Sequence, residues 1–131
     1  MTTNTDVKSY FKIGDTFVLV DGYDGELPDE DYVEGAISCE ISGQAILGKE
    51  QWNLVDQLWA YIVEGLVKLS RNEVYDSSFP DQPLRLRLEP VSAYHVKVTI
   101  GDDVYKLNRI AFVKAMTDGA ERFFVAMKEL Y

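Results

Sequence analysis

The side chains that could carry out chemistry are few and widely spaced in this 131-residue chain. The single cysteine, Cys39, takes an apolar position in an alternating strand pattern, and no histidine or basic residue stands near it to lower the pKa of its thiol. The single histidine, His95, lies beside Lys97 on the polar side of another strand pattern. A cysteine and a distant histidine do not define a nucleophile and its base. We therefore expect a core thiol, an exposed imidazole and no catalytic residue.

Metal and phosphate sites are also not indicated by the spacing of ligand residues. An EF-hand calcium loop needs oxygen ligands at positions 1, 3 and 5 and a glutamate at position 12. Counted from Asp21, the third position is Tyr23 and the twelfth is Tyr32, so the pattern fails. One histidine and one cysteine cannot supply a zinc site, and the glycines match no phosphate-binding loop. We expect no metal and no cofactor, although a looser calcium site in this segment is an alternative.

Negative charge is the most prominent chemical feature, and it is concentrated in the first half of the chain. Residues 1–66 carry 13 acidic and 3 basic side chains, whereas residues 67–131 carry 9 acidic and 10 basic ones. The peak is the segment from Asp21 to Glu34, here called the acidic loop, and no lysine or arginine occurs between Val20 and Lys49. Such a field attracts basic proteins and repels nucleic acid and anionic membranes. It predicts the kind of partner rather than a reaction.

Two residue types in the acidic loop favour protein binding. Carboxylates can pair with a basic partner, and tyrosine is enriched among the residues that dominate binding energy at interfaces. The alternative is that the loop is only a solvated, solubilising surface. The predicted partner contacts are Asp24, Glu26, Asp29, Glu30, Asp31, Tyr23 and Tyr32.

Hydrophobic patterning predicts the elements that position this loop. Two β-rich runs flank Gly14-Asp15 before the loop, and an alternating strand over 37–41 returns through 44–47 after it. Residues 72–83 contain two prolines and are predicted to be a loop. Three further alternating strands follow, and one of their faces carries Arg85, Arg87, Lys97 and Lys106.

Two helices complete the pattern. Residues 49–71 place Trp52, Trp59 and Ile62 on an apolar face roughly 200° wide, about twice what a surface helix needs. That helix is either covered on two sides or partly reserved for a partner. A second helix begins near Asn108, a suitable N-cap, and has a narrower stripe centred on Phe123. The order strands-helix-strands-helix predicts an α+β fold of two layers, with a mainly antiparallel sheet and both helices on one of its faces.

Composition predicts a single domain over residues 1–131, with residues 1–8 frayed. The 47% hydrophobic content suits a packed core, and a lone cysteine excludes an internal disulfide. The chain shows no secretory signal pattern and no apolar run near the ~20 residues of a membrane span. We expect a cytoplasmic protein that does not enter a membrane.

The chain resembles small bacterial immunity proteins, the cytosolic antitoxins that neutralise a toxin. The shared features are an acidic α+β domain, the absence of catalytic residues, and an acidic surface concentrated from Asp21 to Glu34. The aromatic-rich helix, the run Phe79-Pro80-Asp81-Gln82-Pro83 and the final helix also look like uncharacterised bacterial proteins of this size. The resemblance implies a non-enzymatic protein-binding module that occludes a basic, toxin-like protein. The alternative is a structural or assembly protein that forms a homodimer through the first helix or the basic sheet face.

Overall fold

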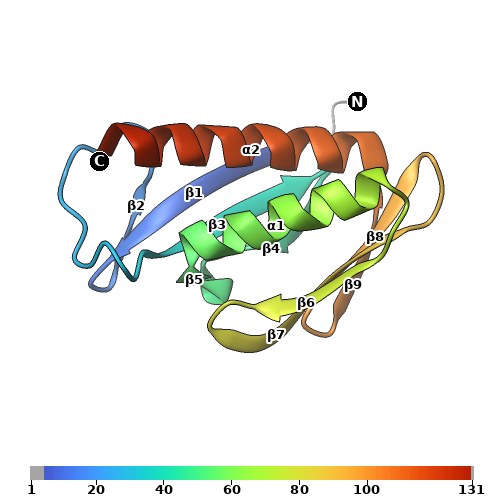
Figure 1. Ribbon diagram of the computed structural model, residues 1–131, viewed down its shortest axis with the longest axis horizontal. Helices are drawn as coiled ribbons and strands as arrows, with labels where there is room; N and C mark the ends of the chain where they lie inside the picture. Colours follow the sequence, from blue (N-terminus) through green and yellow to red (C-terminus); the bar gives the residue numbers. More distant parts are fainter. Residues whose placement is uncertain (1–4, 131) are drawn as a thin grey trace.

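The structure, a computed structural model, describes residues 5–130, and its first element is a β-hairpin (Figure 1). Strands β1 (Asp6–Ile13) and β2 (Thr16–Leu19) are joined by Gly14 and Asp15. Gly14 has a φ of 63°, the left-handed region that a tight hairpin turn requires, so the predicted hairpin is confirmed. The expected fraying of residues 1–8 is wrong for residues 6–8, which are paired within β1. Residues 1–4 lie outside the described residues.

The hairpin belongs to a five-stranded antiparallel sheet. Strand β3 (Glu34–Ile41) lies between β1 and β4 (Gln44–Leu47), and the two-residue strand β5 (Asn53–Leu54) pairs with the start of β3. The predicted strands over 37–41 and 44–47 are confirmed. β3 starts three residues earlier than the alternation indicated, because Glu34 pairs with β5 and the next two residues, Gly35 and Ala36, pair with β1.

The first helix is shorter than predicted. A 3-10 turn (Lys49–Gln51) and β5 precede helix α1 (Val55–Ser70), so the helix predicted over 49–71 begins six residues too early. Trp52 has an extended backbone, with φ −60° and ψ 147°, and is not part of the helical stripe. Asn53 and Leu54 pair with Gly35 and Glu34, and this strand pairing outweighs their place in the apolar helical pattern.

The second half of the chain forms a separate sheet, where the sequence predicted a single one. Its four antiparallel strands are β6 (Tyr75–Phe79), β7 (Gln82–Pro90), β8 (His95–Ile100) and β9 (Asp103–Asn108). The predicted loop over 72–83 therefore contains a strand. Pro80 falls in the turn, and Pro83 lies before the residues of β7 that pair with β8, so neither proline interrupts that ladder.

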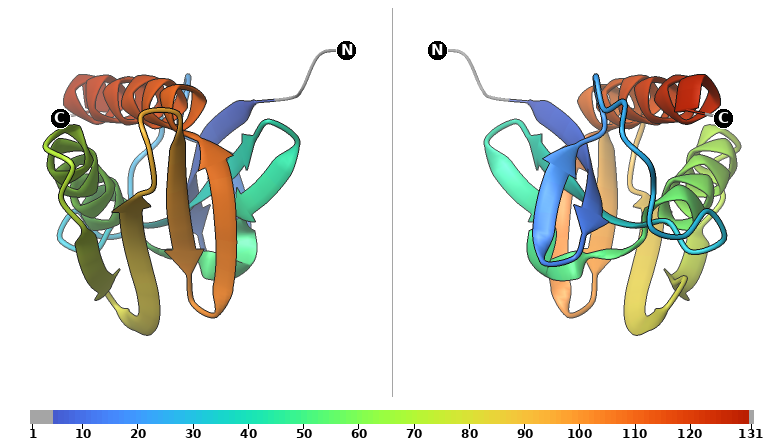
Figure 2. Two further views of the ribbon diagram at one scale, coloured as in Figure 1. Left: turned by 90° about the vertical axis from the view of Figure 1, so that its right-hand side faces the viewer. Right: turned by 90° about the vertical axis from the view of Figure 1, so that its left-hand side faces the viewer.

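Helix α2 (Arg109–Leu130) closes the structure, and its predicted N-cap is confirmed by a hydrogen bond from the Ala111 N–H to Asn108 Oδ1 of 2.8 Å. The helices run in opposite directions across the apolar faces of the two sheets (Figures 1 and 2). Helix α1 contacts both sheets and α2, which accounts for its wide stripe: it is covered on two sides. The α+β class, the two layers and the order strands-helix-strands-helix are confirmed.

One tight contact explains a glycine that the helical pattern left without a reason. Gly119 of α2 is buried, and a Cβ there would lie 2.7 Å from Val7 Cγ1 and 2.8 Å from Trp59 Cη2. The absent side chain lets the Trp59 indole pack against the helix backbone. The same indole donates a hydrogen bond to Ser9 Oγ (2.9 Å), so β1, α1 and α2 meet at this point.

Candidate functional site

The acidic loop connects β2 to β3 and is attached to the core at several points (Figure 1). Val20 and Val33 are buried near its ends, and Leu27 packs on the core in its middle. Tyr23 turns its ring inward, edge-on to Phe11 with centroids 5.4 Å apart. Its hydroxyl donates to the Glu26 carbonyl oxygen at 2.7 Å, which closes the first half of the loop. These attachments hold the loop in one arrangement.

The loop's carboxylates point to solvent. The five predicted acidic contacts are all exposed, and no ion pair within residues 5–130 involves any of them. Asp29 Oδ1 accepts the Asp31 N–H at 2.9 Å, so a local turn sets the spacing of the last acids. Tyr32 is 63% exposed and stands among them. The arrangement is a fixed, uncompensated negative surface with one free aromatic ring.

The two predicted tyrosines therefore differ in their surroundings. Tyr32 lies on the surface with the acids, whereas Tyr23 is half-buried and anchors the loop from below. Sequence pattern could not distinguish them, because the alternation that marks strand faces is absent from an irregular loop. A small cavity of about 120 Å³ lies between the end of the loop and the hairpin. Lys12, Asp29 and Tyr32 are among the residues that line it.

An aromatic surface beside the loop was not found by sequence reasoning. Tyr10 and Phe17 share the outer face of the hairpin, because Tyr10 is opposite Leu19 and Phe17 is opposite Lys12. Lys49 Nζ lies 4.7 Å from the Tyr10 ring centroid and 5.8 Å from that of Phe17, and Lys12 Nζ lies 4.6 Å from that of Trp52. The period-2 patterns of 10–13 and 16–19 indicated which side chains of each strand share a face. Only the register of the hairpin shows that the aromatic side chains of the two strands lie on the same face.

Three of the four cations of the basic sheet face form ion pairs within their own sheet. Arg85 and Arg87 each place a guanidinium nitrogen 2.8 Å from Asp76 Oδ2, and Glu89 pairs with Arg87 at 3.5 Å and with Lys97 at 3.7 Å. Hydrogen bonding to Arg85 lowers the pKa of the Asp76 carboxyl. Ion pairs between neighbouring strands therefore neutralise this face in part, and Lys106 is in none of the ion pairs among residues 5–130.

The candidate nucleophile lies deep in the core. Cys39 is 1% exposed, and its Sγ is 3.6 Å from Met116 Sδ. Burial raises the pKa of the Cys39 thiol from 9.0 to about 12, with a smaller contribution from the charge of Asp6. His95 is exposed at the start of β8, on the other sheet. The structure brings no nucleophile and base together at these two residues.

Burial of Cys39 leads to a measurable result. We expect the native thiol to resist iodoacetamide at pH 8 and the denatured chain to react readily, because only the thiolate attacks. The folded-state pKa lies above the ordinary value of 9.0, so the stabilisation by the neutral thiol is complete below pH 9 and is lost as the pH rises toward 12. Unfolding midpoints across this range should fall more steeply for the wild type than for Cys39→Ala. Equal slopes, or fast alkylation of the native protein, would contradict the buried position.

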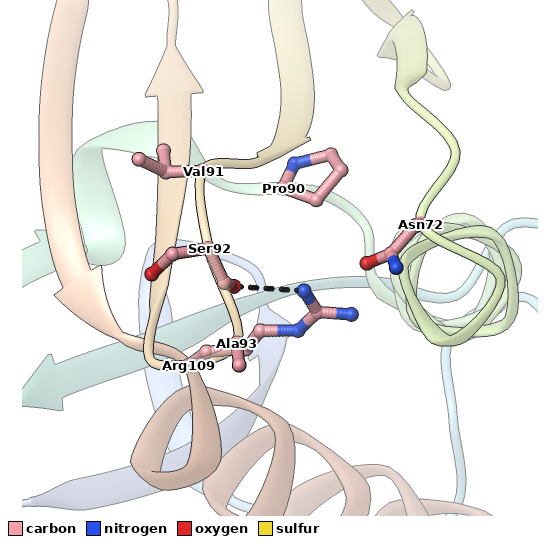
Figure 3. A pocket seen from close by; sticks show the side chains of 6 residues that line it. All are labelled: Asn72, Pro90, Val91, Ser92, Ala93 and Arg109. Carbon is pink, nitrogen blue, oxygen red and sulfur yellow. Dashed lines mark hydrogen bonds between the residues drawn. The ribbon is translucent and has the colours of Figure 1, made fainter.

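A second concave region lies where α1 ends beside the loop between β7 and β8 (Figure 3). It has a volume of about 550 Å³. Arg109 bridges it, donating to the Ser92 carbonyl at 2.9 Å and to the Leu69 carbonyl at 2.7 Å. The Leu69 carbonyl, which also accepts the Asn72 N–H at 2.9 Å, lies at the C-terminal end of α1, where a cation is favourable. Arg109 thus joins two elements, and the lining residues include no acid or base to act on a substrate.

Within the described part of the chain, no three histidine, cysteine, aspartate or glutamate side chains cluster in a way that could hold a metal ion. Over residues 5–130, neither helix is long and apolar enough to cross a membrane. No protein-family model, curated protein or solved structure matches the chain. The site must therefore be interpreted from its own geometry and charge.

Proposed function

We propose that this protein is a non-enzymatic protein-binding module, and most concretely an immunity protein that occludes the active site of a basic toxin with its acidic loop. The observation that carries the proposal is the set of exposed carboxylates at Asp24, Glu26 and 29–31, held on an anchored loop without ion pairs among the described residues. A toxin that acts on phosphate-containing substrates has a cationic cleft. Fixed carboxylates can enter such a cleft in place of the substrate's phosphates.

The physical mechanism is electrostatic steering followed by steric occlusion. Charge complementarity can raise an association rate from about 10⁵–10⁶ M⁻¹s⁻¹ toward 10⁸–10⁹ M⁻¹s⁻¹ at low salt. The anchoring of the loop by Tyr23, Leu27 and Val33 lowers the entropic cost of ordering it on binding. Tyr32, which is 63% exposed, supplies contact area and a hydroxyl group beside the charges.

The homodimer alternative has less support at the surfaces first considered for it. The wide stripe of α1 is packed against both sheets and α2, although Val63 and Val67 remain exposed on that helix. The basic sheet face is paired with Asp76 and Glu89. A face whose two arginines are already paired within its own sheet has less free positive charge for an acidic surface on a second copy.

The test is affinity capture from the native host with matched charge variants. In the loop variant, the three aspartates and two glutamates at 24, 26 and 29–31 become Asn and Gln, which preserves the Asp29 acceptor for the turn. In the control variant, five exposed glutamates elsewhere become Gln: Glu50, Glu64, Glu73, Glu121 and Glu129. Both lose five negative charges, so the two variants are matched in net charge and differ in where that charge was removed.

We expect the wild type and the control variant to capture one basic protein at low salt, and the loop variant to capture far less of it. Both variants should keep or slightly raise the thermal midpoint, because removing like charges relieves self-repulsion. Equal capture by the loop variant would reduce the loop to a solubilising feature. Attention would then move to the exposed valines of α1.

A further inference from the structure

The free edge of β2 offers unpaired backbone groups next to the acidic loop. The five-stranded sheet has the order β2-β1-β3-β4, so β2 pairs with β1 on one side only (Figure 2). The Val20 N–H donates to the Ser9 carbonyl at 3.0 Å, which makes Ser9 and Val20 a hydrogen-bonded pair. In an antiparallel ladder such pairs alternate, so Val18 and Thr16 also bond to β1. The N–H and C=O groups of Phe17 and Leu19 consequently point outward from the sheet edge.

This edge has one of the usual protections against pairing with another chain, its short length of four residues. Natural edge strands are also blunted by proline, by charged residues within the strand, or by a covering element. β2 reads Thr-Phe-Val-Leu, contains none of these residues, and leaves Leu19 48% exposed. Within residues 5–130, no strand other than β1 pairs with it. The edge is therefore available to an added strand.

The charges at the two ends of β2 select the kind of strand that can pair there. Asp15 precedes β2 and Asp21 follows it; both are exposed. In antiparallel self-pairing centred on Val18, Phe17 would face Leu19 of the second copy, and Asp15 would face Asp21 twice. Like charges directly opposite each other are destabilising, so self-pairing in this register is disfavoured. A strand with lysine or arginine at those two positions would instead form two ion pairs. Two cations of the chain itself lie nearby without an ion pair to either aspartate among residues 5–130. Lys12 Nζ donates to the Gly14 carbonyl oxygen at 2.9 Å, and Lys49 Nζ lies over the rings of Tyr10 and Phe17.

We propose that β2 is a docking edge to which an extended, basic segment of the partner adds as an antiparallel strand, with cationic residues opposite Asp15 and Asp21. The inference rests on the proposed function, because it specifies how the same basic partner is held. Backbone hydrogen bonds from Phe17 and Leu19 fix the register of the added strand. The acidic loop, which continues directly from β2, receives the adjoining charges.

The probe is a capped seven-residue peptide, Lys-Thr-Val-Thr-Val-Thr-Lys, titrated into the full chain and followed by two-dimensional amide NMR up to about 2 mM. Its two valines would lie opposite Leu19 and Phe17, and its lysines opposite Asp21 and Asp15. The matched control is the same peptide with N-methyl groups on both valine amides. That change keeps the charge and side chains but removes the two donors aimed at the Leu19 and Phe17 carbonyls.

We expect the unmethylated peptide to shift the Phe17 and Leu19 amide signals and to bind at least about tenfold more tightly than the methylated one, since two backbone hydrogen bonds are lost in the control. Leu19→Pro should weaken binding similarly, because its N–H points away from β1 and the hairpin bonds remain. If Leu19→Pro fails to fold, the comparison of the methylated and unmethylated peptides on the wild type still tests the docking edge. Absence of shifts at Phe17 and Leu19, or equal affinities for both peptides, would overturn the docking edge.

Two further outcomes separate this inference from the proposed function. If both peptides bind equally and shift only the 24–31 amides, the acidic loop recognises basic chains and the docking edge is wrong. If the loop-neutralised variant still binds the unmethylated peptide through Phe17 and Leu19, the edge is supported while the role of the loop is not.

Sedimentation of the wild type alone should show a monomer. A dimer abolished by Leu19→Pro would replace the basic strand with a second copy.

Discussion

Replacing Trp59 by alanine is expected to lower the free energy of unfolding by about 3–5 kcal/mol, the usual cost of truncating a large core aromatic. Trp59 is fully buried, its indole packs on Gly119 and near Phe123, and its Nε1 donates to Ser9 Oγ at 2.9 Å. The truncation would leave a cavity where β1, α1 and α2 meet. Because domains of this size are stable by only about 5–15 kcal/mol, the midpoint of urea unfolding should fall sharply. Phe123→Ala, on the facing helix, should behave similarly.

The chain contains its own control for this change. Trp52, the other tryptophan, is partly exposed outside the helix, and its ring contacts the Lys12 ammonium. Trp52→Ala should cost much less, because it loses a partly solvated contact worth about 0.5–1 kcal/mol and no sealed packing. A midpoint for Trp59→Ala equal to that of the wild type would mean that this face of α1 is not sealed and could bind a partner instead.

Gly35→Ala is expected to be the most damaging single-methyl addition, with a cost of about 3 kcal/mol or more, at or above the upper end for overpacked sites. Gly35 is buried in β3, and a Cβ there would lie 2.0 Å from the Tyr10 carbonyl oxygen and 2.8 Å from Val55 Cγ1. Neither neighbour can rotate away freely, because one is backbone and the other is a buried branched side chain. Chemical denaturation followed by circular dichroism measures the loss.

Gly48→Ala is the matched control for the added methyl group. Its Cβ would approach only the Glu50 carboxylate, at 2.9 Å, and the end of that exposed side chain can move. Its φ of −153° is extended backbone that alanine adopts without strain. We expect little change in stability. A similar loss for both variants would point to a general cost of replacing glycine rather than to the close approach of β3, β1 and α1.

The hydrophobic pattern and the turn and cap residues predicted those elements that have a single buried face. The strand over 37–41, the alternating pattern over 94–100 that forms β8, the Gly14 turn and the Asn108 cap all depend on neighbouring residues in the sequence. The start of α1 could not be predicted in this way. Pairing of Asn53 and Leu54 with β3 is a long-range contact, and it overrides a helical pattern that is continuous through Trp52.

Strand β6 and the division into two sheets were missed for related reasons. Pro80 and Pro83 indicate a break in regular structure. Whether a proline breaks a strand depends on whether its missing N–H would have bonded to the neighbouring strand, and this is set by the register of β7 with β6 and β8. The purpose of Gly119 likewise depends on Trp59, 60 positions earlier in the chain. Propensity alone predicts that alanine would stabilise α2 there, whereas the contact distances predict a clash.

For the candidate site, the sequence predicted the charge and the exposed acids, because charge density is a property of composition. It could not show that Tyr23 faces Phe11 while Tyr32 faces solvent. Nor could it show that the basic strand face is paired with Asp76 and Glu89, because those pairs join neighbouring strands. The free edge of β2 became visible only from the hairpin register together with the bond between Val20 and Ser9.

The most direct test of the proposed function is the association rate of the captured basic partner, measured at about 0.01 M and at about 0.15 M ionic strength, where the screening length falls from about 30 Å to about 8 Å. For the wild type and the control variant with five Glu→Gln changes outside the loop, we expect fast association at low salt that slows markedly at high salt. For the variant neutralised at Asp24, Glu26 and 29–31, we expect slow association with little salt dependence, since steering acts on the on-rate. An on-rate and salt dependence in the loop variant equal to those of the wild type would contradict the acidic loop as the recognition surface.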